Sequence, residues 1–335
     1  MSDNPLAIES AFSVRGKVVL VTGALGLIGL GIVEAFAVNG ALVAASDHRI
    51  RLPVPGPWFP RHDVLSSLKK QFPDLFFAPA NLAEPADLRQ LIAQTVAHFG
   101  RLDAVVHCGG IPYSHGIGYE GDEAFDRLFH INLRSGWILA REALPHLEKT
   151  QGCIVTIASV NGHRPTFAGP LYAATKAGVI SLTRDMANEF GAKCVRANTV
   201  SPGPIPGSRR MAWYISENLT EEYAAKVERW IADHLDEYGR SGQPLARGGR
   251  PSDVALACIY LCSPAARYVS GADVLVDGGY LHHFANWRNR EDTFWPPLRE
   301  FLRSFPPAAW TAPPPEWLTR DDYFSKGPER NRRTN

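Results

Sequence analysis

The sequence predicts an α/β protein of the doubly wound type, with a seven-stranded parallel sheet and helices on both faces of that sheet. Three observations support this prediction. Short apolar runs alternate with helical patterns between residues 17 and 277, as in successive β-α-β units. Several of the runs are apolar at consecutive positions, which is typical of strands covered on both faces. The first run leads directly into a glycine-rich turn and then into a helical pattern.

The order of the elements follows from these patterns. Seven short strands are expected, at residues 17–21, 41–46, 75–78, 104–107, 153–157, 195–199 and 274–276. Five helices are expected between them, at residues 27–39, 85–99, 121–147, 171–190 and 251–261. Pro85 and Pro251 suit the first turn of a helix, where the missing N–H has no intrahelical partner to lose. Asp87 and Asp253 then add negative charge near the positive end of each helix dipole.

Composition excludes several classes of protein. The 335 residues are 45% hydrophobic, which supplies a buried core and excludes wholesale disorder. The net charge of +1 gives no electrostatic footprint for nucleic acid or an anionic membrane. No apolar run approaches the length of a membrane span, and the N-terminus lacks the pattern of a signal peptide. Five cysteines without a C-x-x-C spacing predict no metal site, and Cys258 and Cys262 are expected in the core. A cytoplasmic protein is therefore expected.

The chain divides into three parts. We expect an N-terminal arm at residues 1–13, one domain at residues 14–280, and an extension at residues 281–335. The extension holds eight of the 26 prolines and four of the eight tryptophans. It could cover the active site, reach across a subunit interface or wrap the periphery, and Trp287, Trp295 and Trp310 are expected to be packed. Within the domain, residues 201–250 form a long excursion, which is where doubly wound folds build ligand sites.

The glycine-rich turn predicts a nucleotide site. Gly23, Gly26 and Gly29 follow the first strand and open a helix, so backbone N–H groups can approach a pyrophosphate at the positive helix end. Asp47 lies 18 residues beyond Gly29 at the end of the second strand, near the spacing of a carboxylate that binds ribose hydroxyls. A carboxylate there repels a 2′-phosphate, which favours NAD over NADP. Arg49 and Arg51 are the alternative, because they could bind such a phosphate.

A second group of residues carries the candidate chemistry. Tyr172 and Lys176 are four residues apart at the start of a helix, so their side chains share one face. An adjacent ammonium stabilises the phenolate and lowers the pKa of tyrosine toward use as a general acid and base. Ser159 ends an apolar strand thirteen residues upstream. This conjunction with the glycine-rich turn makes a chance agreement improbable.

At this point the sequence resembles the short-chain dehydrogenase/reductase (SDR) superfamily, in its classical type, over about residues 14–280. The matching motifs occur in order along the chain: Thr22-Gly23, Asp47, Asn132, Ser159, Tyr172, Lys176, Ser201-Pro202-Gly203 and Val276-Asp277-Gly278-Gly279. The resemblance implies a Rossmann-like fold and a catalytic tetrad of Asn132, Ser159, Tyr172 and Lys176. It also implies a homodimer or homotetramer.

The resemblance further implies residue roles. Tyr172 would exchange a proton with the substrate oxygen, which Ser159 would hold. Lys176 would bind the nicotinamide ribose, and Asn132 would interrupt its helix and hold a water that links Lys176 to solvent. The implied cofactor contacts are Gly23, Leu27, Ile28, Gly29, Asp47, Asn81, Leu82, Cys108, Gly109, Gly110, Tyr172, Lys176, Pro202, Gly203 and Ile205.

Some positions depart from the classical pattern. The glycines lie one, four and seven residues after Thr22, as in the extended, epimerase-like branch of the superfamily. His107 stands where the family has asparagine, and it is expected to be a structural histidine beside the cofactor. Asn81 replaces an aspartate that touches adenine, and its amide oxygen could still accept a hydrogen bond from the exocyclic amine.

These features predict an NAD(H)-dependent oxidoreductase that interconverts a secondary alcohol and a ketone or aldehyde. A sugar, a polyol or a cyclic alcohol fits the mixture of polar and aromatic residues expected near the site. The expected substrate contacts are Asn161, His163, Arg164, Trp213 and Tyr214. One alternative is a sugar-nucleotide epimerase or dehydratase, which the glycine spacing suggests, and another is a catalytically silent nucleotide-binding scaffold.

Overall fold

A seven-stranded sheet organises the computed structural model, in the order β3-β2-β1-β4-β5-β6-β7 with every neighbouring pair parallel. The structure describes residues 7–48, 61–111, 121–164, 169–205, 219–234, 237, 244–245, 247–282 and 295–319. The strands are β1 (Val18–Thr22), β2 (Leu42–Ser46), β3 (Phe76–Phe77), β4 (Ala104–His107), β5 (Cys153–Ile157), β6 (Arg196–Pro202) and β7 (Asp273–Val276). All seven expected strands are confirmed, with small shifts at their ends.

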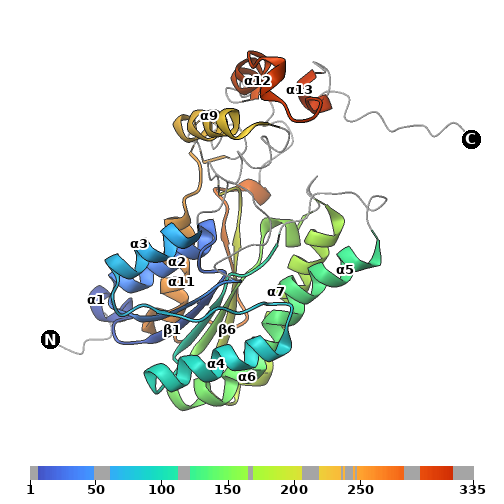
Figure 1. Cartoon of the computed structure of the whole chain (residues 1–335). Coiled ribbons are helices and arrows are strands. Elements are labelled where there is room, and N and C mark those ends of the chain that lie inside the picture. Colours follow the sequence, from blue (N-terminus) through green and yellow to red (C-terminus); the bar gives the residue numbers. More distant parts are fainter. Residues whose placement is uncertain are drawn as a thin grey trace, which may run out of the picture. The chain divides into compact units, whose positions relative to one another are not determined.

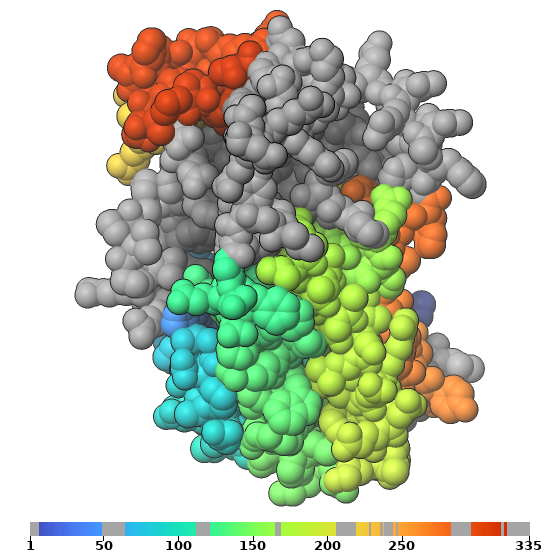
Figure 2. Space-filling view, turned by 90° about the vertical axis from the view of Figure 1, so that its right-hand side faces the viewer, coloured from blue at the N-terminus to red at the C-terminus, as the bar shows by residue number. Residues whose placement is uncertain are grey.

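Helices cover both faces of the sheet, which confirms the doubly wound architecture (Figure 1). The helices of this part are α1 (Ile8–Ala11), α2 (Leu27–Val38), α3 (Arg61–Gln71), α4 (Pro85–Phe99), α5 (Asp122–Phe129), α6 (Ser135–Thr150), α7 (Pro170–Gly191) and α11 (Pro251–Cys262). Helices α2, α3 and α11 pack on one face, and α4, α6 and α7 pack on the other. Figure 2 shows the second face, where the segments coloured from cyan to yellow-green lie side by side.

The alternation of strand side chains explains the two layers of core. In β1, Val19 and Val21 pack into the core on the α2 and α11 face, whereas Val18 and Leu20 pack on the α4 and α6 face. All four side chains are fully buried. An all-parallel sheet requires this burial on both faces, because its crossover helices lie on each side. Free thiols at positions 258 and 262 lie in the first of these cores, as expected.

The helix expected at residues 121–147 is not continuous. A π-helical turn at His130–Arg134 separates α5 from α6, and Asn132 lies at the centre of this turn. A π turn inserts one extra residue into a helix and is common at functional sites. Helix α6 then continues to Thr150, with Pro145 inside it. The interruption that the resemblance implies at Asn132 is thus present in the structure.

The described chain forms two compact units. The first contains the sheet and comprises Met1–Pro55, Phe59–Ile205 and Gly249–Leu281, and the second comprises Gly56–Trp58, Pro206–Gly248 and His282–Asn335. The second unit contains α9 (Glu221–Asp233), α12 (Trp295–Arg303) and α13 (Glu316–Thr319). Most of the 201–250 excursion and most of the C-terminal extension therefore belong to one unit.

The second unit has its own apolar core. Segments from both parts of the chain contribute to it: Leu219, Ala224, Val227, Ile231, Leu298, Leu302, Ala309 and Leu318. Leu219 and Trp310 form an antiparallel bridge, and the Thr220 N–H donates to the Ala309 carbonyl at 2.7 Å. Trp310 is half-buried and packs against this core, whereas Trp287 lies outside the described residues. The extension thus completes the core under α9.

Candidate active site

The glycine-rich turn links β1 to α2 at the carboxyl end of the sheet. Gly23 has a φ of +65°, and a Cβ there would lie 2.8 Å from the Gly109 Cα, so only glycine fits this close approach to the chain after β4. A Cβ on Gly29 would lie 2.0 Å from the Gly23 carbonyl oxygen. The turn and the first turn of the helix are therefore packed backbone against backbone. This packing brings the amino end of α2 to the carboxyl ends of β1 and β4.

The amino end of α2 fits an anionic group. The first backbone N–H groups of a helix have no intrahelical acceptors, and the N-cap residue, Gly26, has no side chain that could cap them. Leu27 and Ile28 are the first two residues of the helix. Their N–H groups and the helix dipole together suit a pyrophosphate. This arrangement fits a dinucleotide, as the sequence predicts.

Asp47 lies just beyond β2 and is 91% buried, with a relative exposure of 9%. Its carboxylate accepts the Leu25 N–H at 3.0 Å and the His48 N–H at 2.7 Å. The first of these bonds links the carboxylate to the glycine-rich turn. The structure thus places this carboxylate beside the turn, and ribose binding by Asp47 stays a prediction. Arg49 and Arg51 lie outside the described residues.

The segments that follow β3 and β4 pack against each other beside the glycine-rich turn. Leu82 packs against Gly109, where a Cβ would lie 2.2 Å from the Leu82 Cδ1. Asn81 forms a turn in which its amide oxygen accepts the Ala83 N–H at 3.1 Å. Burial of the Cys108 thiol raises its pKa to about 12, so the thiol is protonated at neutral pH. Adenine contact by Asn81 stays a prediction.

His107, the last residue of β4, is 3% exposed and has hydrogen-bond partners for both ring nitrogens. Ser135 donates its hydroxyl to the Ile131 carbonyl at 2.6 Å, so it accepts from His107 Nε2 at 3.0 Å. Nδ1 then accepts the Thr22 hydroxyl at 2.7 Å. Desolvation by burial, with a smaller effect from Lys176, lowers the pKa of His107 to about 3. His107 is therefore a neutral link between β1, β4 and α6.

Asn132 and Lys176 are brought together beside the chain that follows β4. The Asn132 amide accepts the Ile111 N–H at 2.8 Å and donates to the Ile111 carbonyl at 3.0 Å. It also donates to the Thr175 hydroxyl at 3.2 Å. A Cβ on Gly110 would lie 3.2 Å from the Asn132 Oδ1 and 3.7 Å from the Lys176 Nζ. Both side chains thus lie next to Gly110.

Lys176 is 95% buried, with a relative exposure of 5%, and its ammonium donates to the Ile157 carbonyl at 2.7 Å. The Nζ atom lies 5.7 Å from the centre of the Tyr172 ring. Both residues come from the first two turns of α7, as the four-residue spacing predicts. The structure thus places a buried cationic group beside the phenol ring. A catalytic role for Tyr172 and Lys176 stays a prediction.

Comparisons with known proteins show the family to which this chain belongs. Residues 23–281 match the family model described as enoyl-(acyl carrier protein) reductase. L-fucose dehydrogenase of Bos taurus is 33% identical over 266 residues, which cover 79% of this chain and 89% of that protein. The chain belongs to the short-chain dehydrogenase/reductase family. A more distant SDR relative, versicolorin reductase 1 of Aspergillus parasiticus, is 31% identical over 264 residues, 79% of this chain and 96% of that protein.

Solved structures of SDR enzymes share the fold. L-sorbose reductase from Gluconobacter frateurii, solved with NADPH and L-sorbose, has a TM-score of 0.69 and 25% identity, covering 82% of this chain and 100% of that one. A short-chain dehydrogenase/reductase from Mycobacterium marinum has a TM-score of 0.65 and 26% identity, covering 82% and 98%. The Rossmann-like fold expected from the sequence is confirmed.

Ser159 caps a short helical turn after β5 in this SDR. The turn, η2, spans Val160–Gly162, and the Ser159 hydroxyl accepts the Asn161 N–H at 3.1 Å. A Cβ on Gly162 would lie 2.8 Å from the Lys176 carbonyl carbon. The turn therefore packs directly on the first part of α7. Ser159 thus precedes a turn that contacts the backbone of Lys176.

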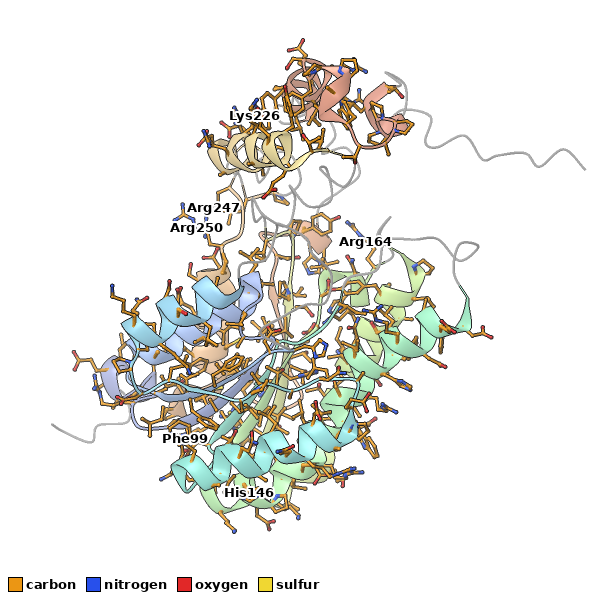
Figure 3. The ribbon with its side chains drawn as sticks, viewed as in Figure 1. Phe99, His146, Arg164, Lys226, Arg247 and Arg250 are labelled. Atoms are coloured by element: carbon orange, nitrogen blue, oxygen red, sulfur yellow. The ribbon has the colours of Figure 1, made fainter. Side chains whose placement is uncertain are left out.

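The other predicted contacts of the SDR site lie at the end of β6, within η2 or just beyond it. Gly203 donates its N–H to the Val276 carbonyl at 3.0 Å, next to Pro202, and Ile205 packs on the core. Figure 3 shows Arg164 at the opposite end of the sheet from Phe99 and His146. Trp213 and Tyr214 lie outside the described residues. Substrate contact by Asn161, His163 and Arg164 stays a prediction.

Sequence reasoning missed three residues that shape the site. Ser135 fixes the His107 ring, Thr175 holds the Asn132 amide, and Asp273 accepts a hydrogen bond from His163. Each of them acts through a partner that is distant in sequence. Thr175 stands between Tyr172 and Lys176, so its place in the motif was the one available signal.

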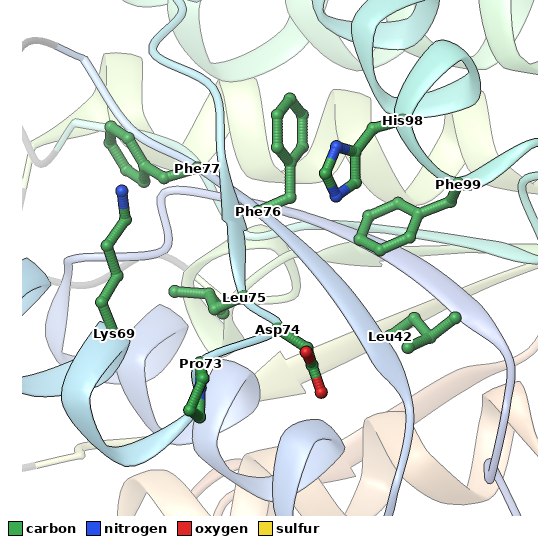
Figure 4. A pocket seen from close by; sticks show the side chains of 9 residues that line it. All are labelled: Leu42, Lys69, Pro73, Asp74, Leu75, Phe76, Phe77, His98 and Phe99. Atoms are coloured by element: carbon green, nitrogen blue, oxygen red, sulfur yellow. The ribbon is translucent and has the colours of Figure 1, made fainter.

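A separate pocket lies away from this chemistry. It has a volume of about 510 Å³ and lies at the edge of the sheet, beside Leu42 at the amino end of β2 and Phe99 at the end of α4. Figure 4 shows the rings of Phe76, His98 and Phe99 in its lining. Within the described ranges, no group of three His, Cys, Asp or Glu side chains could hold a metal ion. In the same part of the chain, no helix has the length and apolarity to cross a membrane.

Proposed function

We propose that this SDR is an NAD(H)-dependent oxidoreductase that interconverts a secondary alcohol and a ketone or aldehyde, with a sugar or polyol as substrate. One observation carries the proposal. The buried Lys176 ammonium lies 5.7 Å from the centre of the Tyr172 ring and beside the Asn132 amide. Such a constellation holds and moves a proton, and it lies at the carboxyl ends of the strands, beside the turn that fits a dinucleotide.

The residues of this chain have distinct tasks in the proposed reaction. The nicotinamide group, when bound, supplies or accepts the hydride. Tyr172 is the general acid and base for the substrate oxygen. The positive charge of Lys176 lies beside the ring that takes up and releases this proton. Ser159 holds the substrate oxygen by a hydrogen bond, which orients the reacting carbon.

The route for the proton leads past Asn132. Its side-chain amide is committed to Ile111 and Thr175, which leaves its backbone in the π turn as the part that can bind a water. This backbone is where a water that links Lys176 to solvent would bind. The π turn therefore supports the role that the resemblance implies for Asn132.

NAD(H) is the proposed cofactor, with NADP(H) as the alternative. The buried Asp47 carboxylate beside the turn supports NAD(H), because it would repel a 2′-phosphate. The structure of L-sorbose reductase contains NADPH, so one structural neighbour binds the phosphorylated form. The charge at Asp47 is the feature of this chain that favours NAD(H).

Two relatives support a sugar or polyol as substrate. L-fucose dehydrogenase is named for a sugar, and L-sorbose reductase was solved with one. The polar side chains next to Ser159, namely Asn161 and Arg164, suit a substrate that carries several hydroxyl groups. We also propose that the protein is cytoplasmic and forms a homodimer or homotetramer. The exposed rings of Phe125 on α5 and Trp137 on α6 support the association of subunits.

An absorbance assay at the NADH band tests the activity. Purified protein with NAD should oxidise members of a panel that includes L-fucose, sugar alcohols, cyclic alcohols and aromatic alcohols. Tyr172→Phe should lower kcat by at least about 100-fold, since general acid–base catalysis contributes that much or more, while the dissociation constant for NADH changes little. The exposed tyrosine at position 268 offers a matched control, Tyr268→Phe, which should keep full activity.

Other results would contradict the proposal. Substantial turnover by Tyr172→Phe would remove the proton role from Tyr172. Retention of bound NAD, with conversion of a sugar nucleotide and no net change in NADH, would favour the epimerase or dehydratase. Binding of NADH without turnover of any compound in the panel would favour the nucleotide-binding scaffold.

A further inference from the structure

The turn that carries Ser159 is held together by its own hydrogen bonds. The Ser159 hydroxyl accepts the Asn161 N–H, and the Ser159 carbonyl accepts the Gly162 N–H at 2.9 Å. The His163 and Arg164 N–H groups both donate to the Val160 carbonyl, at 3.1 and 3.2 Å. Residues 159–164 are therefore joined into one short segment by four hydrogen bonds. The position of its far end is linked in this way to the position of Ser159.

The far end of this segment is bound to β7. His163 Nε2 lies 2.6 Å from the Asp273 Oδ2. Asp273 is the first residue of β7, and its side chain is 94% buried, with a relative exposure of 6%. Because a carboxylate only accepts hydrogen bonds, the Nε2 atom of His163 must be the donor. His163 thus links the serine turn to the edge strand of the sheet.

Asp273 is built into β6 and β7 by further bonds. The Thr199 hydroxyl donates to its Oδ1 at 2.6 Å, and the Ser201 hydroxyl donates to the two carboxylate oxygens at 2.8 and 3.0 Å. Thr199 and Ser201 are fully buried on β6. With His163, the carboxylate has three donors. Its position is well defined, because moving it would break several hydrogen bonds in a region of low dielectric constant.

We propose that His163 and Asp273 are a positioning pair that fixes the turn carrying Ser159, so that the serine hydroxyl is held where the substrate oxygen binds. The inference rests on the proposed function for the role of Ser159, and it replaces substrate contact as the task of His163. Arg164 supports the same end of the turn, since its guanidinium lies over the Tyr280 ring at 5.2 Å. Neither His163 nor Asp273 touches the reacting atoms.

Hydrogen–deuterium exchange of residues 158–164 tests the pair without any substrate. His163→Phe removes the donor, and the opening of the turn should become about fivefold more frequent, as expected for the loss of one hydrogen bond. His163→Gln keeps an N–H donor at a similar reach and should restore most of the protection. Glu148→Ala removes an exposed ion pair with Lys193 and should leave this segment unchanged. Unchanged exchange in His163→Phe would overturn the proposal.

A double-mutant cycle with Ser159→Ala tests the consequence for catalysis. His163→Phe should lower kcat by about tenfold or more, because small misplacements of a catalytic group are costly, and should change KM much less. In the Ser159→Ala background the same substitution should have less than about a twofold effect, since coupled residues are not additive. Fully additive losses would show that His163 acts elsewhere and would contradict the proposal.

The exchange experiment and the double-mutant cycle together separate a failure of this inference from a failure of the proposed function. If no alcohol is turned over by the wild-type protein, the proposed function fails, and the exchange experiment still decides whether His163 holds the turn. If turnover is present and the exchange of residues 158–164 does not respond to His163→Phe, the positioning pair fails alone. A lower thermal midpoint with unchanged exchange in this segment would also count against it.

Discussion

At the scale of single residues, His107 shows how surroundings decide protonation. The sequence places a histidine at the end of β4, beside the candidate site, which alone is compatible with a catalytic base. In the structure both ring nitrogens have partners, and Thr22, Gly109 and Ser135 complete a closed network in which the Gly109 N–H donates to the Thr22 hydroxyl at 3.3 Å. A ring with both nitrogens occupied, and a pKa lowered to about 3, does not act as a base.

This pKa predicts how stability depends on pH. The unfolded chain protonates His107 below about pH 6.5, whereas the folded chain does not until about pH 3. The unfolded state therefore binds more protons in this window, and stability is lost as the pH falls from about 6.5 toward 3, by at most about 1.4 kcal/mol per pH unit. Urea unfolding at pH 5 and 7 should show a smaller difference for His107→Asn than for the wild type.

A control and a direct measurement accompany this prediction. His98→Asn changes an exposed histidine on α4 and should keep the pH dependence of the wild type. The ring nitrogens of His107, observed by NMR in the wild type, should show the neutral form with the proton on Nε2 down to about pH 4. Protonation with a midpoint near 6.5 would contradict the assigned network.

Asp47 carries a prediction about cofactor preference. Asp47→Ala removes the negative charge beside the glycine-rich turn, and the kcat/KM ratio of NAD to NADP should fall by at least about tenfold, because like charges placed together cost several kcal/mol. Asp74→Ala, which removes an exposed carboxylate at the amino end of the sheet, should leave the ratio unchanged. An unaltered ratio in Asp47→Ala would mean that another residue reads the ribose.

At the scale of elements, the β1–turn–α2 unit could be predicted from the sequence in detail. Three glycines between an apolar run and a helical pattern leave few alternatives, and at Gly23 and Gly29 the backbone approach is too close for a side chain. The strands were predictable for a similar reason, since their apolar runs are buried on both faces. The short helix α3 was not predicted, because much of its surface is polar.

Gly29 gives a testable prediction for this unit. A Cβ at Gly29 would lie 2.0 Å from the Gly23 carbonyl oxygen, so Gly29→Ala should force the turn away from the helix. We expect a loss of stability of about 1–3 kcal/mol, as for other overpacked positions, and a large rise in the dissociation constant for NADH. Calorimetry and fluorescence titration measure the two effects.

A second glycine serves as the matched control. Gly191 ends α7, and a Cβ there would meet no atom within 4 Å. Gly191→Ala should therefore leave NADH binding unchanged and should raise stability slightly, by at most about 1 kcal/mol, because alanine is the better helix former. Equal behaviour of the two variants would show that the turn tolerates a side chain at Gly29.

At the scale of the whole molecule, the C-terminal extension is part of a small second unit. Leu298 and Leu302 of α12 pack with Val227 and Ile231 of α9, so the extension fills the core beneath a helix of the 206–248 segment. Both segments are unusual in the sequence, and the aromatic residues of the extension predict packing there. The packing of the two segments against each other could not be predicted, because the sequence shows the apolar face of each helix but not which other helix covers it.

Deletion of residues 283–335 tests this arrangement. The truncation exposes the apolar face of α9, and limited proteolysis should cleave residues 206–248 at least about tenfold faster, because the local free energy of opening falls. NADH binding should persist, since the contacts of the glycine-rich turn and Asp47 lie in the first unit. A milder variant, Leu302→Ala, should show the same effect in smaller measure. Unchanged proteolysis would mean that α9 is stable without the extension.

The sequence by itself determined the doubly wound fold, the strand order in the chain, the glycine-rich turn and the candidate set Asn132, Ser159, Tyr172 and Lys176. These features depend on local spacing and on apolar periodicity, which neighbouring residues encode. Only the tertiary structure decided that His107 is neutral, that His163 is bound to Asp273, and that the extension shares a core with α9. Each of these depends on contacts between segments far apart in the chain, whose energies arise from burial and hydrogen bonding after the chain has folded.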